Sequence, residues 1–450
     1  MTGELLALGA SHKTAPLPLR ERLALTEARA SKVLTDLVAH ESVHEAVAMS
    51  TCNRTELYLV TADPVEAESA ALGVLARQSG LRPTELMGAL YSMRGPEAVE
   101  HLFSVAAGLD SMIVGEAEIQ GQVRRAYEAA LAEGVTGPVS NRLFRDALAT
   151  GKRVRSETEV SRSNVSVSSV AVQLAAQFLG DLASRRVLVI GAGENAELTA
   201  RALRERGVRT VFVANRRYDR ALGLAQRFDG QAVTFDDLPA ELEAADIVVS
   251  STGAPHQIVG RDELAVVARG RLNRPLVLLD LAVPRDIEPS ARDCPGIALY
   301  DMDDLQEAVA RNLGGRESEA AGARVLVREE VERFERWRDS LDVVPTISAL
   351  RRRGEDVVLQ VLRENESRWQ SLSDADRERL ETMARAVVSR MLHEPTVRLK
   401  AAAGEDDSYR FVHALRDLFA LDSLPGETSD DAVAEVTALA SRRRRRSRSG

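Results

Sequence analysis

The chain has 450 residues, of which 44% are hydrophobic and 28% are charged, and this composition excludes an intrinsically disordered or fibrous protein. Its length exceeds what one ordinary core covers, so we expect about two to four domains. The formal net charge of -9 argues against a dedicated nucleic-acid binder, although a local basic groove stays open, and the two cysteines exclude a disulfide framework.

The N-terminal residues carry Glu4 and lack the basic start and long apolar run of a signal peptide. No stretch reaches the roughly 18 apolar residues of a membrane span. The low cysteine content is typical of a reducing compartment. We therefore expect a cytoplasmic protein with no membrane partner.

The first part of the chain alternates strand and helix patterns. Strands are predicted at residues 4–10, 45–49 and 57–61, and helices at residues 28–40, 96–107 and 123–133. Pro96 stands where helices begin and Gly134 where they end. These elements predict an α/β or α+β domain over residues 1–160.

A second alternation follows, with longer apolar runs. Strands are predicted at residues 186–190, 211–214, 247–250 and 276–279, and helices at residues 165–179, 197–206 and 220–228. Continuous apolar strands separated by helices are typical of a doubly wound parallel sheet. We expect this Rossmann-type domain over residues 161–302.

From Asp303 onward the pattern is helical only. Helices are predicted at residues 303–340, 347–362, 374–392 and 409–419, with the first weakened at Gly314 and Gly315 and ended or bent by Pro345. This region, residues 303–425, suits a long linker helix and dimerisation, with a self-contained bundle as the alternative. Residues 426–450 are predicted to form a disordered basic tail, with contact to RNA phosphates left open.

The run at residues 187–196 reads as a strand, then G-x-G-x-x-A, then a helix. Gly191 permits the tight turn, Gly193 lets a pyrophosphate approach the backbone, and Ala196 allows close packing of helix on strand. A helix N-terminus supplies free N–H groups to phosphates. This context predicts a dinucleotide site that also includes Ala192, Glu194 and Asn195, and the alternative is a Rossmann-like domain that binds no nucleotide.

The end of the next strand discriminates between the nicotinamide cofactors. An NAD site usually has an acid there, but the chain has Asn215, Arg216 and Arg217. Two arginines attract a 2′-phosphate, so the sequence predicts NADPH. The alternative is that both arginines begin a solvated helix.

A second polar cluster, residues 49–56, contains Cys52 and Arg54. A cysteine attacks as the thiolate, and a nearby guanidinium such as that of Arg54 stabilises the thiolate. By composition alone a buried, inert cysteine is the simpler interpretation.

The sequence of this cluster, Ser-Thr-Cys-Asn-Arg-Thr-Glu, closely resembles the signature of the glutamyl-tRNA reductase family. Further segments resemble the same family in chain order, at residues 9–16, 108–116 with 121–122, 280–286 and 393–396. The resemblance covers nearly the whole chain except about the last 25 residues.

The resemblance implies a reaction. Cys52 attacks the ester of glutamyl-tRNA(Glu), displaces the tRNA and holds the glutamyl group as a thioester. NADPH reduces the thioester to glutamate 1-semialdehyde, the first committed step of five-carbon tetrapyrrole (porphyrin and haem) biosynthesis. A thioester is easier to reduce than a carboxylate, so covalent catalysis divides a difficult step. The family also implies a homodimer and a complex with glutamate-1-semialdehyde aminomutase, and it implies no metal.

The resemblance also implies roles for residues. Arg54 binds the glutamate side chain, and the other pocket positions are Thr51, Asn53, Ser111, Glu116, Ala117, Glu118 and Gln122. Glu116 meets the α-ammonium group, and His101 polarises the carbonyl or protonates the alkoxide, or is only a satisfied helix histidine. The family commonly has Gln where this chain has Glu118, and an acid there would repel the substrate carboxylate.

Two other functions compete with this one. They are an NADPH-dependent oxidoreductase on a free small molecule, similar to shikimate dehydrogenase, and a non-catalytic NADPH sensor. Because Cys52 and the glycine motif lie in different predicted domains, we also expect a hinge at residues 160–165 or near Asp301 that closes the cofactor domain over the pocket.

Overall fold

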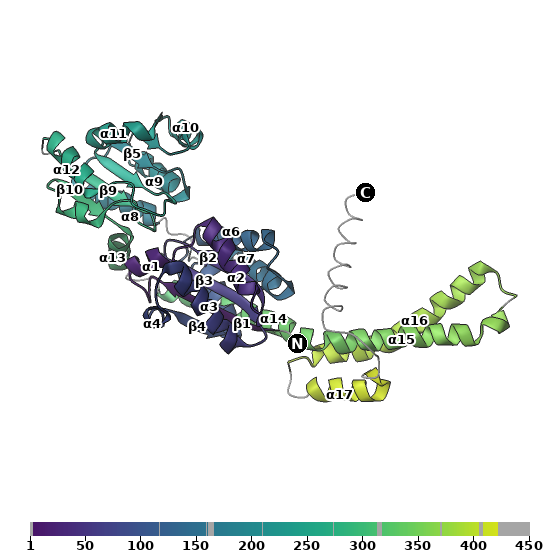
Figure 1. The fold of residues 1–450 in the computed structure, drawn as a ribbon. Coiled ribbons are helices and arrows are strands. Elements are labelled where there is room, and N and C mark those ends of the chain that lie inside the picture. Colours follow the sequence, from purple (N-terminus) through teal and green to yellow (C-terminus); the bar gives the residue numbers. More distant parts are fainter. Residues whose placement is uncertain are drawn as a thin grey trace. The chain divides into compact units, whose positions relative to one another are not determined.

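The computed structural model describes residues 3–116, 118–158, 160, 166–208, 210–272, 274–312, 317–369, 371–404 and 408–421. They form two compact units, Gly3–Val331 and the C-terminal part from Glu332 (Figure 1). The predicted fold class is confirmed: an N-terminal α/β part, a Rossmann-type part and an all-helical C-terminal part follow one another along the chain. The predicted boundaries at 160, 302 and 425 stay predictions.

The N-terminal sheet has four antiparallel strands in the order β2-β3-β1-β4. They are β1 (Glu4–Ser11), β2 (Val43–Ser50), β3 (Arg54–Thr61) and β4 (Tyr91–Arg94). The accompanying helices are α1 (Leu17–Leu23), α2 (Glu27–Val38), α3 (Pro64–Ser79), α4 (Pro83–Leu86), α5 (Pro96–Ala106), α6 (Glu118–Ala132) and α7 (Pro138–Glu157). Strands β2 and β3 are both longer than predicted, so the polar cluster is reduced to a tight hairpin turn at residues 51–53.

The second sheet has six parallel strands in the order β10-β9-β8-β5-β6-β7. They are β5 (Arg186–Ile190), β6 (Thr210–Ala214), β7 (Gln231–Val233), β8 (Ile247–Ser250), β9 (Leu276–Asp280) and β10 (Ile297–Tyr300). The helices are α8 (Val167–Leu179), α9 (Glu194–Glu205), α10 (Tyr218–Arg227), α11 (Leu238–Ala244), α12 (Arg261–Gly270) and α13 (Met302–Asn312), with 3-10 helices η2 (Phe235–Asp237) and η3 (Pro289–Asp293).

Helices cover both faces of this sheet, as the apolar runs predict. Val187 and Val189 of β5 belong to a cluster with α8, α9, α10 and α13. Leu188 and Ile190 belong to a separate cluster with α11 and α12. Alternate residues of one strand thus enter two cores, which is why the strand is apolar throughout.

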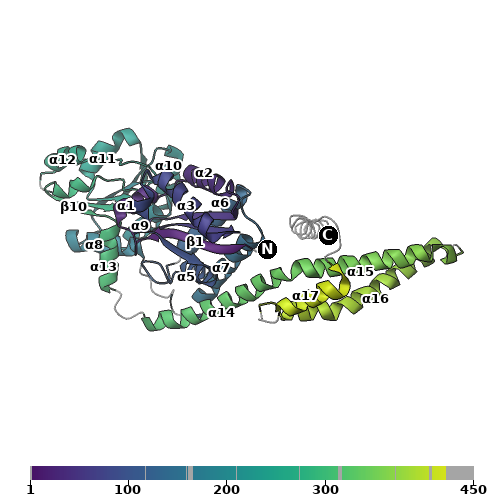
Figure 2. The same cartoon turned by 60° about the horizontal axis from the view of Figure 1, so that its bottom comes forward.

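The C-terminal part begins within α14 (Glu317–Asp342). It continues with α15 (Val344–Glu364), the 3-10 helix η4 (Glu366–Trp369), α16 (Asp374–Ala401) and α17 (Ser408–Phe419). Helices α15 and α16 run side by side in both views, with α17 against them (Figure 2). Gly354 permits this closeness, because a Cβ there would lie 2.7 Å from Val388 Cγ1. The predicted interruption at Pro345 is confirmed, since α14 ends at Asp342 and Pro345 lies in the first turn of α15.

The predicted end of a helix at residue 392 is wrong, because α16 continues through Pro395 to Ala401. Thr396 Oγ1 donates to the Leu392 carbonyl at 2.7 Å, and Leu399 is buried against Val343 and Ile347. This packing holds the helix together beyond the proline.

Several predictions fall outside the described residues, namely those for Ala117, for the hinge at 161–165, for Gly314 and Gly315, and for the tail at 426–450. Among the described residues no helix is both long and apolar enough to cross a bilayer. In the same part of the chain no three His, Cys, Asp or Glu side chains are grouped so that they could hold a metal ion.

Candidate active site

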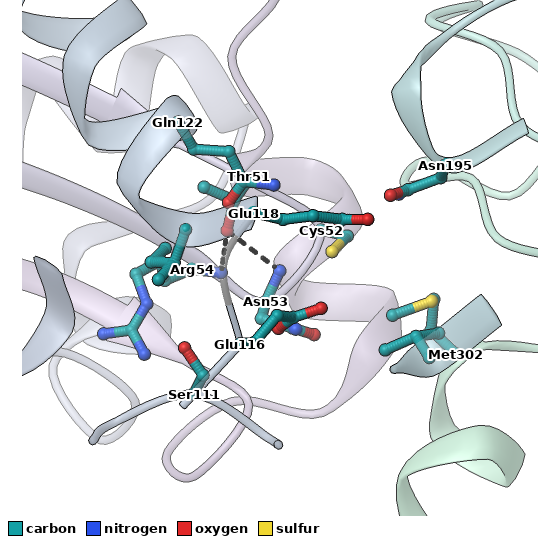
Figure 3. A pocket seen from close by; sticks show the side chains of 12 residues that line it. Thr51, Cys52, Asn53, Arg54, Ser111, Glu116, Glu118, Gln122, Asn195 and Met302 are labelled. Atoms are coloured by element: carbon teal, nitrogen blue, oxygen red, sulfur yellow. Dashed lines mark hydrogen bonds between the residues drawn. The ribbon is translucent and has the colours of Figure 1, made fainter. Parts of the chain in front are cut away.

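Cys52 lies at the tip of the β2–β3 hairpin. The Thr51 side chain organises the turn, because its Oγ1 accepts the backbone N–H groups of Asn53 and Arg54 at 3.2 Å each (Figure 3). The turn is tied to the loop after β1 by the His12 N–H, which donates to the Asn53 carbonyl at 2.8 Å. Cys52 is left as a free, half-buried thiol.

The cavity at Cys52 gathers most of the predicted substrate residues. Its lining comprises Thr51, Cys52, Asn53, Arg54, Ser111, Glu116, Glu118, Ile119, Gln122, Val167, Asn195 and Met302. Asn195 and Met302 enter from the side opposite the hairpin (Figure 3). The cavity measures only about 20 Å³, room for about one water molecule, so any larger group requires it to widen.

Two carboxyl groups in this cavity have pKa values well above the ordinary value for glutamate. Burial, with the charge of Glu194, raises the pKa of Glu116 to about 7. Burial, with the charges of Glu116 and Glu194, raises the pKa of Glu118 to about 8. Burial and these two carboxylates raise the pKa of the Cys52 thiol to about 12. In this arrangement the cavity holds Cys52 as a neutral thiol.

The orientation of Arg54 differs from the prediction that its guanidinium stabilises the Cys52 thiolate. Its guanidinium points away from Cys52 (Figure 3) and donates to Glu56 Oε1 at 2.8 Å and to Asp110 Oδ2 at 3.0 Å. The cation that acts to lower the pKa of Cys52 is Arg20 instead. Arg54 Nε is buried and has no hydrogen-bond partner among the described residues.

His101 does not line the cavity. Its Nε2 lies 2.9 Å from Glu56 Oε1, on the far side of Arg54, and Glu56 also accepts hydrogen bonds from Tyr58 and Tyr91. Burial opposes ionisation of Glu56, but the charges of Arg54 and His101 hold its pKa well below the usual range. His101 therefore belongs to a buried ionic cluster behind the pocket.

Arg20 also belongs to the site around Cys52, and the sequence did not indicate it. Its side chain is 4% exposed, and its Nη1 donates to the Cys52 carbonyl at 2.8 Å. An arginine in a helix usually contacts solvent, so nothing in its sequence context indicates a buried position. Val167, an apolar residue on a predicted helix, and Met302, directly before another predicted helix, were missed because apolar residues at such places usually belong to a core.

A second cavity, of about 290 Å³, lies at the ends of the parallel strands, where dinucleotides bind in this type of sheet. Its lining comprises Gly191, Ala192, Gly193, Asn215, Arg216, Arg220, Phe235, Ser251, Thr252, Gly253 and Ile258. Gly191 has φ +105°, and a Cβ there would lie 2.3 Å from the Ser251 carbonyl, so no other residue fits.

The predicted cofactor residues divide into three groups. Gly191, Ala192, Gly193, Asn215 and Arg216 line this cavity. Ala196 is buried in the core beneath it, as close helix packing requires. Arg217, Glu194 and Asn195 do not line it: Arg217 pairs with Asp219, Glu194 pairs with Arg125, and Asn195 lines the Cys52 cavity. Arg220, about one turn further along α10, lines the cavity where Arg217 does not.

The loop at residues 251–253 was missed by sequence reasoning. Asp286 accepts hydrogen bonds from Ser250 Oγ at 2.7 Å and from the Thr252 N–H at 2.9 Å, and so holds this loop beside the glycine turn. Asp286 belongs to the segment at 280–286 that carried part of the family resemblance, which is the signal that could have found the loop.

Comparison with known proteins agrees with this geometry. Residues 8–158 match the family model for the N-terminal domain of glutamyl-tRNAGlu reductase, and residues 322–421 match that for its dimerisation domain. Glutamyl-tRNA reductases of Magnetococcus marinus and Geobacter sulfurreducens are each 43% identical to this chain, over 93% of it and over 99% and 96% of those proteins. The chain belongs to the glutamyl-tRNA reductase family.

A solved structure supports the same assignment. Glutamyl-tRNA reductase from Methanopyrus kandleri is 32% identical, with a TM-score of 0.51, covering 93% of this chain and 99% of that one. The chain is therefore an enzyme with glutamyl-tRNA reductase activity, which provides the first step of tetrapyrrole biosynthesis.

The residues that each family model matches decide against the two competing functions. The model for shikimate and quinate 5-dehydrogenases matches residues 173–308 alone, which makes this part an NAD(P)-binding dehydrogenase domain. Residues 8–158 and 322–421 match glutamyl-tRNA reductase domains. A free-small-molecule dehydrogenase and a non-catalytic sensor are both excluded by this assignment.

Proposed function

We propose that Cys52 is the nucleophile that accepts the glutamyl group of glutamyl-tRNA(Glu), and that the resulting thioester is reduced to glutamate 1-semialdehyde. The observation that carries this proposal is the shared cavity, in which Cys52 of the hairpin meets Asn195 of the helix that begins at the glycine motif. Sulfur and cofactor helix must meet if one carbon is to be bound by the first and reduced beside the second.

The first step exchanges one ester for another. The Cys52 sulfur bonds to the carbonyl carbon, the bond to the ribose oxygen breaks, and the thiol proton passes to that oxygen. We assign this transfer to Glu116 and Glu118, which line the same cavity, because carboxyl groups with pKa values of about 7 and 8 can both accept and donate a proton near neutral pH.

Substrate recognition draws on the same lining residues. We assign the glutamate side chain to Arg54, whose unpartnered Nε is a free donor, with Ser111 and Gln122 beside it. The α-ammonium group is assigned to Glu116, because a cation beside that carboxyl group would favour its ionised form. Thr51 and Asn53 shape the hairpin turn.

Glu118 replaces the amide that the family commonly has, and its protonated form resolves the expected repulsion. A neutral carboxyl group donates a hydrogen bond, as an amide does. At neutral pH burial keeps Glu118 largely protonated, because its pKa is about 8. We propose for His101 a positioning role through Glu56 and Arg54, in place of direct proton transfer.

NADPH fits the second cavity. The glycine turn leaves space that a Cβ would fill. Arg216 and Arg220 line the same cavity, whose lining residues include no acid, so they offer positive charge to a 2′-phosphate. When bound, NADPH supplies the hydride. The glycine turn before α9 would hold its pyrophosphate, and the two arginines would hold its 2′-phosphate.

The decisive experiment is a single turnover without NADPH. The enzyme is mixed with glutamyl-tRNA labelled in the glutamate, quenched with acid and weighed by mass spectrometry. A glutamyl adduct on Cys52, absent from Cys52→Ser, retained in Cys294→Ser and released as aldehyde when NADPH is added, supports the proposal. An intact tRNA ester with no adduct contradicts it.

We propose a homodimer that forms through the C-terminal part. Its dimerisation domain carries large apolar side chains that are solvent-exposed in one copy, among them Val357, Val361, Met383, Val387 and Met391. A second copy would bury them, and light scattering of the purified protein tests the homodimer. A complex with the aminomutase that consumes the aldehyde, and a cytoplasmic location that keeps Cys52 reduced, stay proposals.

A further inference from the structure

Helix α1 carries two neighbouring charged residues, and each binds a different segment of the cofactor-binding part (helices α8 to α13 and their sheet). Arg20 is the first. Its Nη2 donates to Asp303 Oδ1 of α13 at 2.5 Å, its Nε to the Ala15 carbonyl at 3.2 Å and its Nη1 to the Cys52 carbonyl at 2.8 Å. One guanidinium therefore connects the catalytic turn with the cofactor-binding part.

Glu21 is the second. Its Oε1 accepts the Arg285 backbone N–H and Nε, and its Oε2 accepts Arg285 Nη2, all at 2.8 Å. Both side chains are 16% exposed, so this is a partly buried, bidentate ion pair. Charge-assisted pairs of this geometry are the strong ones. Arg285 follows β9 and lies in the loop that contains Asp286, which holds the edge of the cofactor cavity.

The interface between the N-terminal part and the cofactor-binding part, which these two ion pairs join, also covers Cys52. Cys52 packs against the core cluster that contains Met302, the residue before Asp303. Met302 lines the Cys52 cavity as well. The same interface that α1 holds together is thus the one that closes the cavity around the sulfur.

We propose that Arg20 and Glu21 form a latch that holds the cofactor-binding part against Cys52, and that Arg20 is a positioning residue for the catalytic turn. With the latch released, the cavity opens for glutamyl-tRNA. With the latch formed, water is kept from the thioester while it awaits reduction. This inference rests on the proposed function, because shielding matters only if Cys52 carries an acyl group.

Charge explains why release would activate the thiol. The groups that act on Cys52 are Arg20 of α1, Glu116 of the preceding loop and Glu118 of α6, besides burial. In the closed form Asp303 shares the charge of Arg20. Separation leaves Arg20 without that acid and admits water, and both changes favour the thiolate.

Alkylation of Cys52 tests the latch without tRNA or NADPH. The full-length enzyme is treated with iodoacetamide from pH 6 to 10, and the rates at Cys52 and at buried Cys294 are followed by peptide mass. Glu21→Gln and Asp303→Asn should each increase the alkylation rate of Cys52. The increase should be about tenfold for every unit by which the pKa of the thiol falls. Glu68→Gln, which breaks an ion pair with Arg94 inside the N-terminal part, is the matched control and should change neither rate.

Arg20 itself supplies a second readout. Arg20→Gln breaks the same ion pair as Asp303→Asn but also removes the cation, so Cys52 should be alkylated more slowly in Arg20→Gln than in Asp303→Asn. Arg20→Lys keeps the charge, so its rate should exceed that of Arg20→Gln. A merely structural role predicts equal rates for both variants. If Arg20→Gln does not fold, Asp303→Asn and Glu21→Gln still decide.

The latch is refuted if Cys52 is alkylated at the same rate in wild type, Glu21→Gln and Asp303→Asn. It is also refuted if the alkylation rate of Cys294 rises together with that of Cys52, because that result would indicate general unfolding. Under single turnover with NADPH, the two latch variants should still form the thioester but release more free glutamate and less aldehyde than wild type. Accelerated alkylation with no thioester in any variant would uphold the latch and contradict the proposed function.

Discussion

The carboxylate of Glu56 lies 2.8 Å from Nη1 of Arg54 inside the N-terminal sheet, and the two side chains are 0% and 1% exposed. Burying both charges is tolerable because each has further partners. Asp110 accepts from Arg54, while Tyr58, Tyr91 and His101 contact Glu56. The signature residues of the hairpin are therefore part of the core as well as of the site.

Removing one partner should be costly. Glu56→Ala leaves the Arg54 guanidinium buried with less compensation, and loss of one member of a buried pair typically costs about 3–5 kcal/mol. Urea unfolding followed by the fluorescence of an N-terminal probe measures it. Glu68→Ala, at a half-exposed pair with Arg94, should have little effect, and equal losses in the two variants would contradict a special role for the buried pair.

The raised pKa of Glu118 makes stability depend on pH. An unfolded chain releases this proton near the ordinary value of 4.5, but the folded protein keeps it until about pH 8. The stabilisation is therefore complete below about pH 4.5 and is lost as the pH rises toward 8.

Glu118→Gln should remove that loss. Its melting temperature should exceed that of wild type at pH 8.5 and approach it at pH 5, as measured by calorimetry across the range. A constant difference between the two proteins at every pH would show that the carboxyl group does not titrate as the cavity requires.

Cofactor choice should depend on one of two adjacent arginines. Arg216→Gln should raise the KM for NADPH by about tenfold or more and leave that for NADH nearly unchanged, because a charge-assisted phosphate contact is lost. Arg217→Gln should change neither value much, since Arg217 pairs with Asp219 outside the cavity. Steady-state kinetics with both cofactors checks this, and the reverse ranking would place the phosphate at Arg217.

The glycine turn should tolerate no side chain. In Gly191→Ala the new Cβ would lie 2.3 Å from the Ser251 carbonyl at a φ of +105°, so nucleotide binding and stability should both fall. Gly223→Ala, in α10 with no atom within 4 Å of a Cβ, should be neutral or slightly stabilising. NADPH titration and thermal unfolding of both variants compare them, and normal binding by Gly191→Ala would exclude the proposed turn.

Local signals account for what could be predicted. The apolar runs of the parallel sheet, the spacing of Gly191, Gly193 and Ala196, and the cluster around Cys52 are short-range patterns, and each predicted the element or cavity in which it lies. They succeed because strand burial and tight turns are determined by a few consecutive residues.

The misses involve contacts between distant residues. Helix α16 continues past Pro395 because Leu399 packs against α15, which no local rule contains. The choice between Arg217 and Arg220 depends on which face of α10 meets the cavity.

The sequence by itself determined the order of the domains, the glycine turn and the cysteine that we propose as the nucleophile, since each depends on residues adjacent in the chain. Only the tertiary structure decided that Arg54 points away from Cys52, that Arg20 reaches its carbonyl, and that Asp303 reaches Arg20 from 283 residues away. Charge and burial act through space, so the protonation of Cys52 is a property of the folded arrangement and not of the motif that contains it.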